Sequence, residues 1–323
     1  MPGLVARRVA QAALVAWLAA TLVFVLVHLA PGDPFAASLD NPSVSPEARA
    51  RWMAAYGLDR PVLEQYGLYL RGVLRGELGW SFSQARPVAD AIRGALPNTL
   101  VLMGVALGGS FVVGVALGAW QAARRGSAAE LAVSRVSLFV YSLPDFWLAL
   151  VLLVALTYWV RLFPTGGITN TTLYPFFGPW ERAVDRLWHL ALPAGTLMLL
   201  SAAGIARFQR AAMLEVLGED FVRTARAKGA SERRVVLRHA WRNALLPMVT
   251  LLGLTLPALV GGAVFVEKVF AWPGMGLLLV TAVEQRDYWL VTACVLVGSV
   301  MVALGSLLAD LLSAVVDPRL RAR

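Results

Sequence analysis

Six long apolar runs occupy most of this chain, and they restrict the folds that are open to it. They lie at about 9–30, 97–123, 131–160, 188–212, 245–266 and 288–312. Since about 20 apolar residues cross a bilayer as a helix, each run is long enough for one transmembrane span. Charged residues make up 15% of the chain, against about 25% in soluble globular proteins. The sequence therefore predicts an all-α membrane protein with six transmembrane helices.

Two of the runs need interpretation. The first follows Arg7 and Arg8 and so resembles a signal peptide, but its apolar core is too long and no small-residue cleavage site follows it. We therefore expect a retained span. The third run is long and contains Pro144, so that it is either kinked, or tilted, or extends beyond the bilayer.

The basic residues orient the spans. With the N-terminus inside, segments 1–8, 124–135, 207–246 and 310–323 are internal, and they hold 17 Lys and Arg residues against seven acids. The short outer loops hold five basic residues. Because Lys and Arg favour cytoplasmic loops, both termini are predicted to be cytoplasmic. The same bias accounts for the net charge of +9. We therefore expect no nucleic acid as a partner.

Residues 31–96 form a predicted large first extracytoplasmic loop. Ser45-Pro46-Glu47 is typical of a helix start and Gly57 of a helix end. Pro61 can open a second helix, whose predicted apolar stripe consists of Val62, Leu63, Tyr66, Leu70 and Leu74. The loop is either a solvated segment with two short helices or a docking surface for an external partner.

The internal segment 213–246 is basic, and an apolar span holds it at each end. Gly229 is predicted to have a positive φ and to end a first helix, while Ser231 caps a second one. The predicted apolar face of the first helix is Leu214, Leu217, Phe221 and Ala225, and that of the second is Leu237, Ala240, Trp241 and Ala244. The basic edges are Arg223, Arg226, Lys228, Arg233, Arg234, Arg238 and Arg242. This helical hairpin rests either on anionic lipid headgroups or in the groove of a soluble partner.

Short motifs along the chain carry a family resemblance. The internal segment contains RTARAKG from Arg223 to Gly229 and RNALLP ending at Leu246-Pro247. The other motifs are Leu29-Ala30-Pro31-Gly32-Asp33-Pro34, Tyr56-Gly57-Leu58-Asp59-Arg60-Pro61, Gly79-Trp80-Ser81, Leu96-Pro97-Asn98-Thr99, and Ser142-Leu143-Pro144 with Phe146-Trp147-Leu148. In these features the chain resembles the inner-membrane permease subunits of ABC importers, and most of all the branch that transports dipeptides, oligopeptides, nickel or glutathione. The Glu of the family's cytoplasmic EAA loop is missing, as in the peptide branch.

The resemblance implies a permease subunit that forms half of a translocation pathway in a bacterial or archaeal cytoplasmic membrane. It implies as partners a second homologous permease, two ABC ATPase subunits that use ATP and Mg, and an extracytoplasmic substrate-binding protein. The residues that it assigns to ATPase coupling are Arg223, Thr224, Ala225, Arg226, Lys228, Gly229, Ser231, Arg233 and Pro247. The domain organisation is then a tip and first helix at 1–30, an extracytoplasmic loop at 31–96, and a five-helix core at 97–323.

The chain is expected to be no enzyme and to bind no cofactor or metal itself. It lacks the G-x-x-x-x-G-K-[ST] motif that cradles ATP phosphates, and its three histidines fall in different segments. An ATP-independent carrier or channel is the alternative function. The sequence of a carrier is expected to show paired broken spans and an internal repeat.

Asp145 is the one acid in the middle of a predicted span. An ionisable side chain at that depth is a candidate for lining the pathway, because burying its charge is unfavourable. Equally, Pro144 can break the helix, Ser142 can cap the next half, and Asp145 can then stabilise the kink from the positive helix end. The residues leave both roles open.

Overall fold

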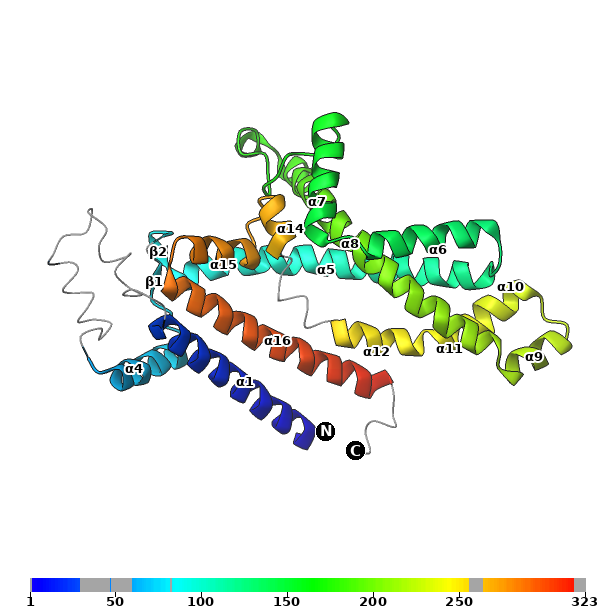
Figure 1. Cartoon of the computed structure of the whole chain (residues 1–323), viewed down its shortest axis with the longest axis horizontal. Helices are drawn as coiled ribbons and strands as arrows, with labels where there is room; N and C mark the ends of the chain where they lie inside the picture. The colour runs from blue at the N-terminus through cyan, green and yellow to red at the C-terminus, as the bar shows by residue number, and fades with distance from the viewer. Residues whose placement is uncertain (1, 30–46, 48–59, 82, 256–263, 317–323) are drawn as a thin grey trace. The chain divides into compact units, whose positions relative to one another are not determined.

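The computed structural model describes residues 2–29, 47, 60–81, 83–255 and 264–316 (Figure 1). Most of these residues are helical, and the two strands among them, β1 (Trp80–Ser81) and β2 (Arg86–Pro87), form one short antiparallel hairpin. The predicted class, an all-α membrane protein, is confirmed at this level.

Four of the described helices are long and apolar enough to cross a membrane: α1 (Pro2–Leu29), α5 (Val88–Ala123), α8 (Pro179–Leu217) and α16 (Tyr288–Val316). The pair α6 (Ala128–Tyr141) and α7 (Asp145–Leu153), which the π-helical turn η1 (Val154–Trp159) continues, makes a fifth if it is one span. The predicted run 245–266 opens with α12 (Leu246–Thr255), and residues 256–263 lie outside the described part of the chain.

The third apolar run is bent, which decides among its three interpretations. The axes of its two halves differ by 104° across the break at 142–144. Pro144 has an extended backbone there, with φ −62° and ψ 138°. Proline has no N–H for the helical ladder and disfavours helix in the residue before it, so the break falls at this position.

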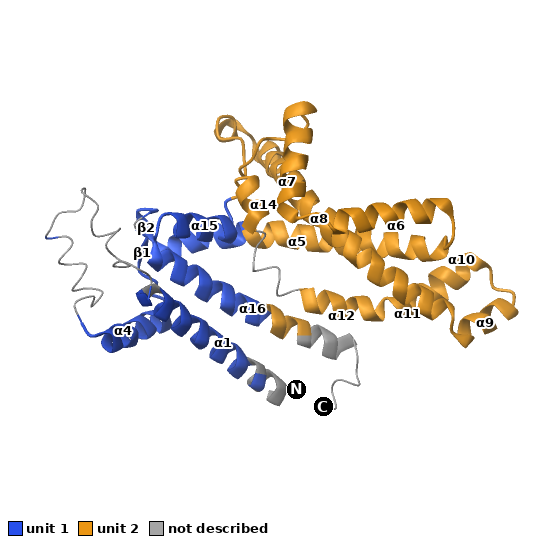
Figure 2. Cartoon of the chain, viewed as in Figure 1, with its two compact units in different colours: residues 1–98, 273–304 blue, residues 99–272, 305–323 orange. Residues whose placement is uncertain are grey.

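The described chain divides into two compact units (Figure 2). Unit 1 consists of residues 1–98 and 273–304. Its core lies where the start of α5, α15 (Met275–Glu284) and the start of α16 meet, around Val88, Ile92, Leu278 and Leu290. Burial of apolar side chains between these helices holds the two distant stretches of sequence together.

In unit 1, α4 (Val62–Arg75) confirms the predicted helix after Pro61 and ends at Gly76. The predicted apolar stripe is covered only in part: Tyr66 faces α1, with its hydroxyl 2.7 Å from that of Thr21. Leu63 and Leu74, at the two ends of the stripe, are 81% and 88% exposed. The predicted helix at 45–57 lies outside the described residues apart from Glu47.

Asp287 fixes the β1–β2 hairpin to the start of α16. Its Oδ2 accepts hydrogen bonds from the hydroxyls of Ser81 at 2.6 Å and Ser83 at 2.8 Å, and from the Ser83 backbone N–H at 3.0 Å. Its Oδ1 accepts from the backbone N–H of Leu290. One buried carboxylate therefore both caps a helix and holds a loop that precedes it by some 200 residues in sequence.

Unit 2 consists of residues 99–272 and 305–323, and α8 runs through its middle. Two glycines of α5, Gly114 and Gly118, lie against α8: a Cβ on Gly114 would come within 2.7 Å of Ile205 Cβ, and one on Gly118 would clash with the Ala206 backbone. These small residues let the two helices pack closely.

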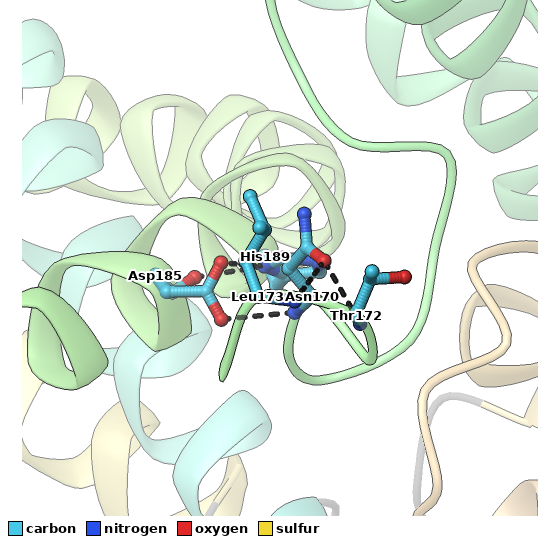
Figure 3. Close-up of polar contacts among 5 residues, drawn as sticks. All are labelled: Asn170, Thr172, Leu173, Asp185 and His189. Carbon is cyan, nitrogen blue, oxygen red and sulfur yellow. Dashed lines mark hydrogen bonds and ion pairs between the residues drawn. The ribbon is translucent and has the colours of Figure 1, made fainter. Parts of the chain in front are cut away.

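A polar cluster ties the loop before α8 to the beginning of that helix (Figure 3). The Asp185 carboxylate accepts the backbone N–H of Asn170 at 2.9 Å and lies 3.4 Å from Nδ1 of His189. The Asn170 side chain in turn accepts the backbone N–H groups of Thr172 and Leu173, both at 3.1 Å. Backbone N–H groups of the loop thus donate hydrogen bonds to the Asp185 and Asn170 side chains, and the bond to Asp185 holds the loop against α8.

Candidate functional site: the 213–246 segment

The first half of this segment is a separate short helix. Gly218 ends α8 at Leu217, and α9 (Asp220–Ala227) begins after Glu219. The predicted apolar face, continuous from Leu214 to Ala225, is therefore wrong: Val222 is fully buried, whereas Phe221 is 43% exposed. The break at Gly218 resets the helical phase, so that spacing counted from Leu217 no longer identifies the buried side.

The turn after α9 confirms the predicted positive φ of Gly229, which is 80°. The Gly229 N–H donates to the Arg226 carbonyl at 2.9 Å, and the Ala230 N–H donates to the Ala225 carbonyl at 3.2 Å. A Cβ on Gly229 would meet nothing within 4 Å. The requirement for glycine thus comes from the left-handed backbone and not from lack of space.

The second half of the segment is helical but irregular. It consists of α10 (Glu232–Arg234), the π-helical turn η3 (Val235–Ala240) and α11 (Trp241–Ala244). Ser231 occupies the N-cap position as predicted, but its side chain makes no capping bond. Its backbone carbonyl accepts the Val235 N–H at 2.9 Å. Leu237 was assigned to the apolar face and is 47% exposed, because the π turn shifts the phase and buries Val235 instead.

The buried side of the segment packs against the ends of two long helices. Ala240, Ala244 and Met248 form a cluster with Ala119 and Ala122 of α5 and with Ala212 and Met213 of α8. The α5–α6 turn accordingly lies at the same end of unit 2 as α9 to α11 (Figure 1). The segment is therefore packed directly on both helices.

The charged edge is largely exposed, with two internal ion pairs. Arg226 Nε donates to Glu232 at 2.7 Å across the Gly229 turn, and this hydrogen bond raises the pKa of Arg226. Arg223 pairs with Asp220 at 3.3 Å, and the Thr224 hydroxyl donates to the Asp220 backbone carbonyl. The remaining exposed cations, with no polar partner among the described residues, are Lys228, Arg233, Arg234, Arg238 and Arg242.

The other predicted residues lie on either side of this surface. Ala225 is half-buried beneath the turn, and Pro247 is the exposed second residue of α12, where the segment ends. Asp145 lies at the bend of the α6–α7 pair, outside this segment. The structure therefore groups the predicted coupling residues on one face of unit 2, with Asp145 apart from them.

Asp145 is the first residue of α7, as the kink hypothesis requires, and its Oδ1 accepts only the adjacent Phe146 N–H, at 2.9 Å. No cation pairs with it among the described residues. The predicted capping role of Ser142 is wrong: Ser142 ends α6, its hydroxyl donates to the Leu138 carbonyl, and Pro144 is the residue that precedes α7. Serine at the end of a helix bonds back to the preceding turn.

Sequence reasoning missed the pair Glu130–Arg210 beside this segment. Glu130 is almost fully buried. Its carboxylate forms an ion pair with Arg210 and accepts hydrogen bonds from the Ser134 hydroxyl and the Gly126 backbone N–H. A signal existed, since Ser127 with Glu130 three residues later is the pattern of a capping box, and the Ser127 hydroxyl does accept the Glu130 N–H. Nothing in the sequence pointed to the partner on α8.

Two family models match almost the whole chain. Residues 1–103 match the N-terminal domain of a binding-protein-dependent transport system membrane component, and residues 114–322 match the inner membrane component itself. The second match contains the whole 213–246 segment.

Relatives named as peptide permeases are similar over most of their length. An oligopeptide transport system permease protein of Bacillus subtilis is 40% identical, with 93% of each chain covered. A dipeptide transport system permease protein of Escherichia coli is 37% identical, and a putative peptide permease protein of Brucella ovis is 42% identical, again with 93% of each chain covered. The chain is therefore a multi-pass membrane protein that belongs to the inner membrane components of binding-protein-dependent transport systems, the permease subunits of ABC importers.

Proposed function

We propose that this chain forms half of the translocation pathway of an importer for dipeptides, oligopeptides or a related small solute. Family membership argues against the alternative of an ATP-independent carrier or channel. The peptide substrate is proposed from the names of the similar permeases.

In this proposal six helices cross the cytoplasmic membrane of a bacterium or archaeon, and both termini are cytoplasmic. The fifth of these spans is the run predicted at 245–266, of which the structure describes α12. The partners are a second homologous permease, two ABC ATPase subunits and an extracytoplasmic binding protein. This chain carries out no catalytic step, and ATP and Mg are used by the ATPase subunits.

The segment 213–246 is the proposed contact with an ATPase, through Arg223, Thr224, Ala225, Arg226, Lys228, Gly229, Ser231 and Arg233. One observation carries this assignment. The apolar base of the segment is already buried against α5 and α8, while Phe221 and Leu237 are exposed beside unpaired cations. A helix lying on headgroups would use its apolar face for lipid. Here that face is occupied by protein, which leaves the outer face for a soluble partner.

Copurification and transport test the proposal together. The tagged chain is extracted from its native membrane, copurifying subunits are identified by mass spectrometry, and the complex is reconstituted in liposomes. We expect an ATPase subunit to copurify and labelled peptide to enter only with ATP. If an ion gradient drives uptake in the absence of ATP, the result would support the alternative of an ATP-independent carrier. If uptake is driven by ATP but unlabelled peptides do not compete with it, the importer role stands and only the proposed substrate class is rejected.

A further inference from the structure

One cavity of unit 1 takes no part in the transport role proposed above. Its volume is about 630 Å³, and four parts of the unit line it: the end of α1, one side of α4, the segment 76–89 and the start of α16. A space of this size accommodates a ligand as large as a typical drug or cofactor.

The cavity lies where two spans end. Phe24 and His28 line it from the end of the apolar window Val9–Leu26, and Trp289 and Leu296 line it from the beginning of the window Tyr288–Ala309. Trp80 of the hairpin completes the aromatic wall. Trp and Tyr gather at the boundary between the hydrocarbon layer and the headgroups, so the cavity opens at headgroup level.

Its charged lining consists of two arginines and one glutamate. Arg71 and Arg75 lie one turn apart on α4, both are exposed, and neither has a hydrogen-bond or ion-pair partner in the described part of the chain. Glu77 is the one acid of the lining. His28 and Gln65 are hydrogen-bonded to each other at 3.2 Å. Two unpaired guanidinium groups beside an aromatic and aliphatic floor match a ligand with an anionic head and an apolar tail.

The hairpin side of the wall is fixed by close contacts. Gly79 has φ 88°, and a Cβ at this position would come within 3.0 Å of the Trp289 ring. Asp287 holds the neighbouring Ser81 and Ser83 through the three bonds described above. Because the aromatic wall is packed in this way, the cavity has its shape before any ligand binds, which lowers the entropic cost of binding.

We propose that this cavity binds an anionic phospholipid, with its phosphodiester at Arg71 and Arg75 and one acyl chain along Phe24, Trp289 and Leu296. A phosphodiester is a strong charge-assisted hydrogen-bond acceptor for arginine guanidinium groups, so the two arginines favour an anionic lipid headgroup. A free inorganic anion would use the arginines but not the apolar floor. The two sources of phosphate are therefore distinguishable.

The test uses the protein purified in detergent with its copurifying subunits. Phosphatidylglycerol or phosphatidylcholine is added, and retained lipid is counted by native mass spectrometry. Arg71→Gln with Arg75→Gln is expected to lower the affinity for phosphatidylglycerol roughly tenfold. The control, Arg60→Gln with Arg86→Gln, removes two exposed charges of the same unit that do not line the cavity, and should retain the lipid.

A second variant tests the apolar part. Ala89 lines the cavity from the hairpin side and is half-buried, so that Ala89→Trp fills space without removing a charge. We expect it to reduce retention of phosphatidylglycerol while the protein remains monodisperse. Equal lipid retention in the arginine variant and its control would overturn the proposal. Displacement of bound lipid by millimolar inorganic phosphate alone would also overturn it, in favour of a simple anion site.

Discussion

Glu130 on α6 and Arg210 on α8 form an ion pair with an N–O distance of 3.0 Å, across helices separated by 80 residues. The carboxylate is 2% exposed and the guanidinium 33%. The pair lies next to the helix ends on which the 213–246 segment packs, so it joins the α5–α6 turn to the helix that leads into that segment. The ion pair thereby ties the first half of the bent α6–α7 pair to α8.

Removing Arg210 should destabilise unit 2. Arg210→Ala leaves a buried carboxylate without its cation, so we expect a lower free energy of unfolding; because Arg210 is partly exposed, the loss should be smaller than for a fully buried pair. Thermal unfolding in detergent measures it. Arg207→Ala, which removes only a stacking contact with Tyr141, is the control. Adding Glu130→Gln to Arg210→Ala should restore part of the loss, and no recovery would refute the charge argument.

Gly229→Val should uncouple transport without preventing membrane insertion. The left-handed backbone at φ 80° costs a non-glycine residue about 1–2 kcal/mol, and more for a β-branched one. Gly229→Asn is the matched control, because asparagine tolerates this conformation and no atom lies near its Cβ. Substrate-stimulated ATPase activity of the reconstituted complex is the readout. Equal activity of the two variants would show that the turn geometry is irrelevant.

Reversing the charged edge should weaken assembly with an ATPase. Arg226→Glu with Lys228→Glu opposes whatever complementary surface docks there, and copurified ATPase should fall several-fold. Since Arg226 is paired with Glu232, the exchange Arg226→Glu with Glu232→Arg serves as control, preserving both the pair and the net charge. Wild-type stoichiometry in the double reversal would favour the lipid-headgroup hypothesis for this segment.

The orientation of the chain is testable by labelling. In a Cys294→Ser background, Gly178→Cys should react with an impermeant maleimide from outside intact cells and Ser231→Cys should not, because the short internal segments carry the excess of basic residues. Arg60→Cys gives an independent site on the first loop. Labelling of Ser231→Cys from outside would invert the topology and remove the contact with an ATPase.

Two substitutions at Asp145 distinguish a pathway-lining role from a role in stabilising the kink. If its charge lines the pathway, Asp145→Asn should change the uptake rate at normal membrane yield; if it only stabilises the start of α7, Asn keeps the bond to the Phe146 N–H and uptake stays normal. Asp145→Leu should then lower the yield. Uptake and yield measured for both variants decide, and wild-type values throughout would exclude both roles.

Local signals in the sequence predicted much of the molecule. Apolar runs located α1, α5, α8 and α16, because each span must be apolar along its length whatever it packs against. Gly229 predicted a positive φ, and Pro144 indicated a bend as one of three interpretations of its run, since both signals follow from the covalent structure of one residue.

Contacts between distant residues were decided only by the tertiary structure. Asp287 with Ser81, and Glu130 with Arg210, join positions whose spacing carries no periodic pattern. The buried side of the 213–246 segment was also decided there, because the break at Gly218 and the π turn at 235–240 shift the helical phase by amounts that a 3.6-residue period does not contain. A helical period identifies the buried face correctly only within one uninterrupted helix. Because this segment is interrupted at Gly218 and by the π turn, Val222 and Val235 are buried, whereas Phe221 and Leu237 are exposed.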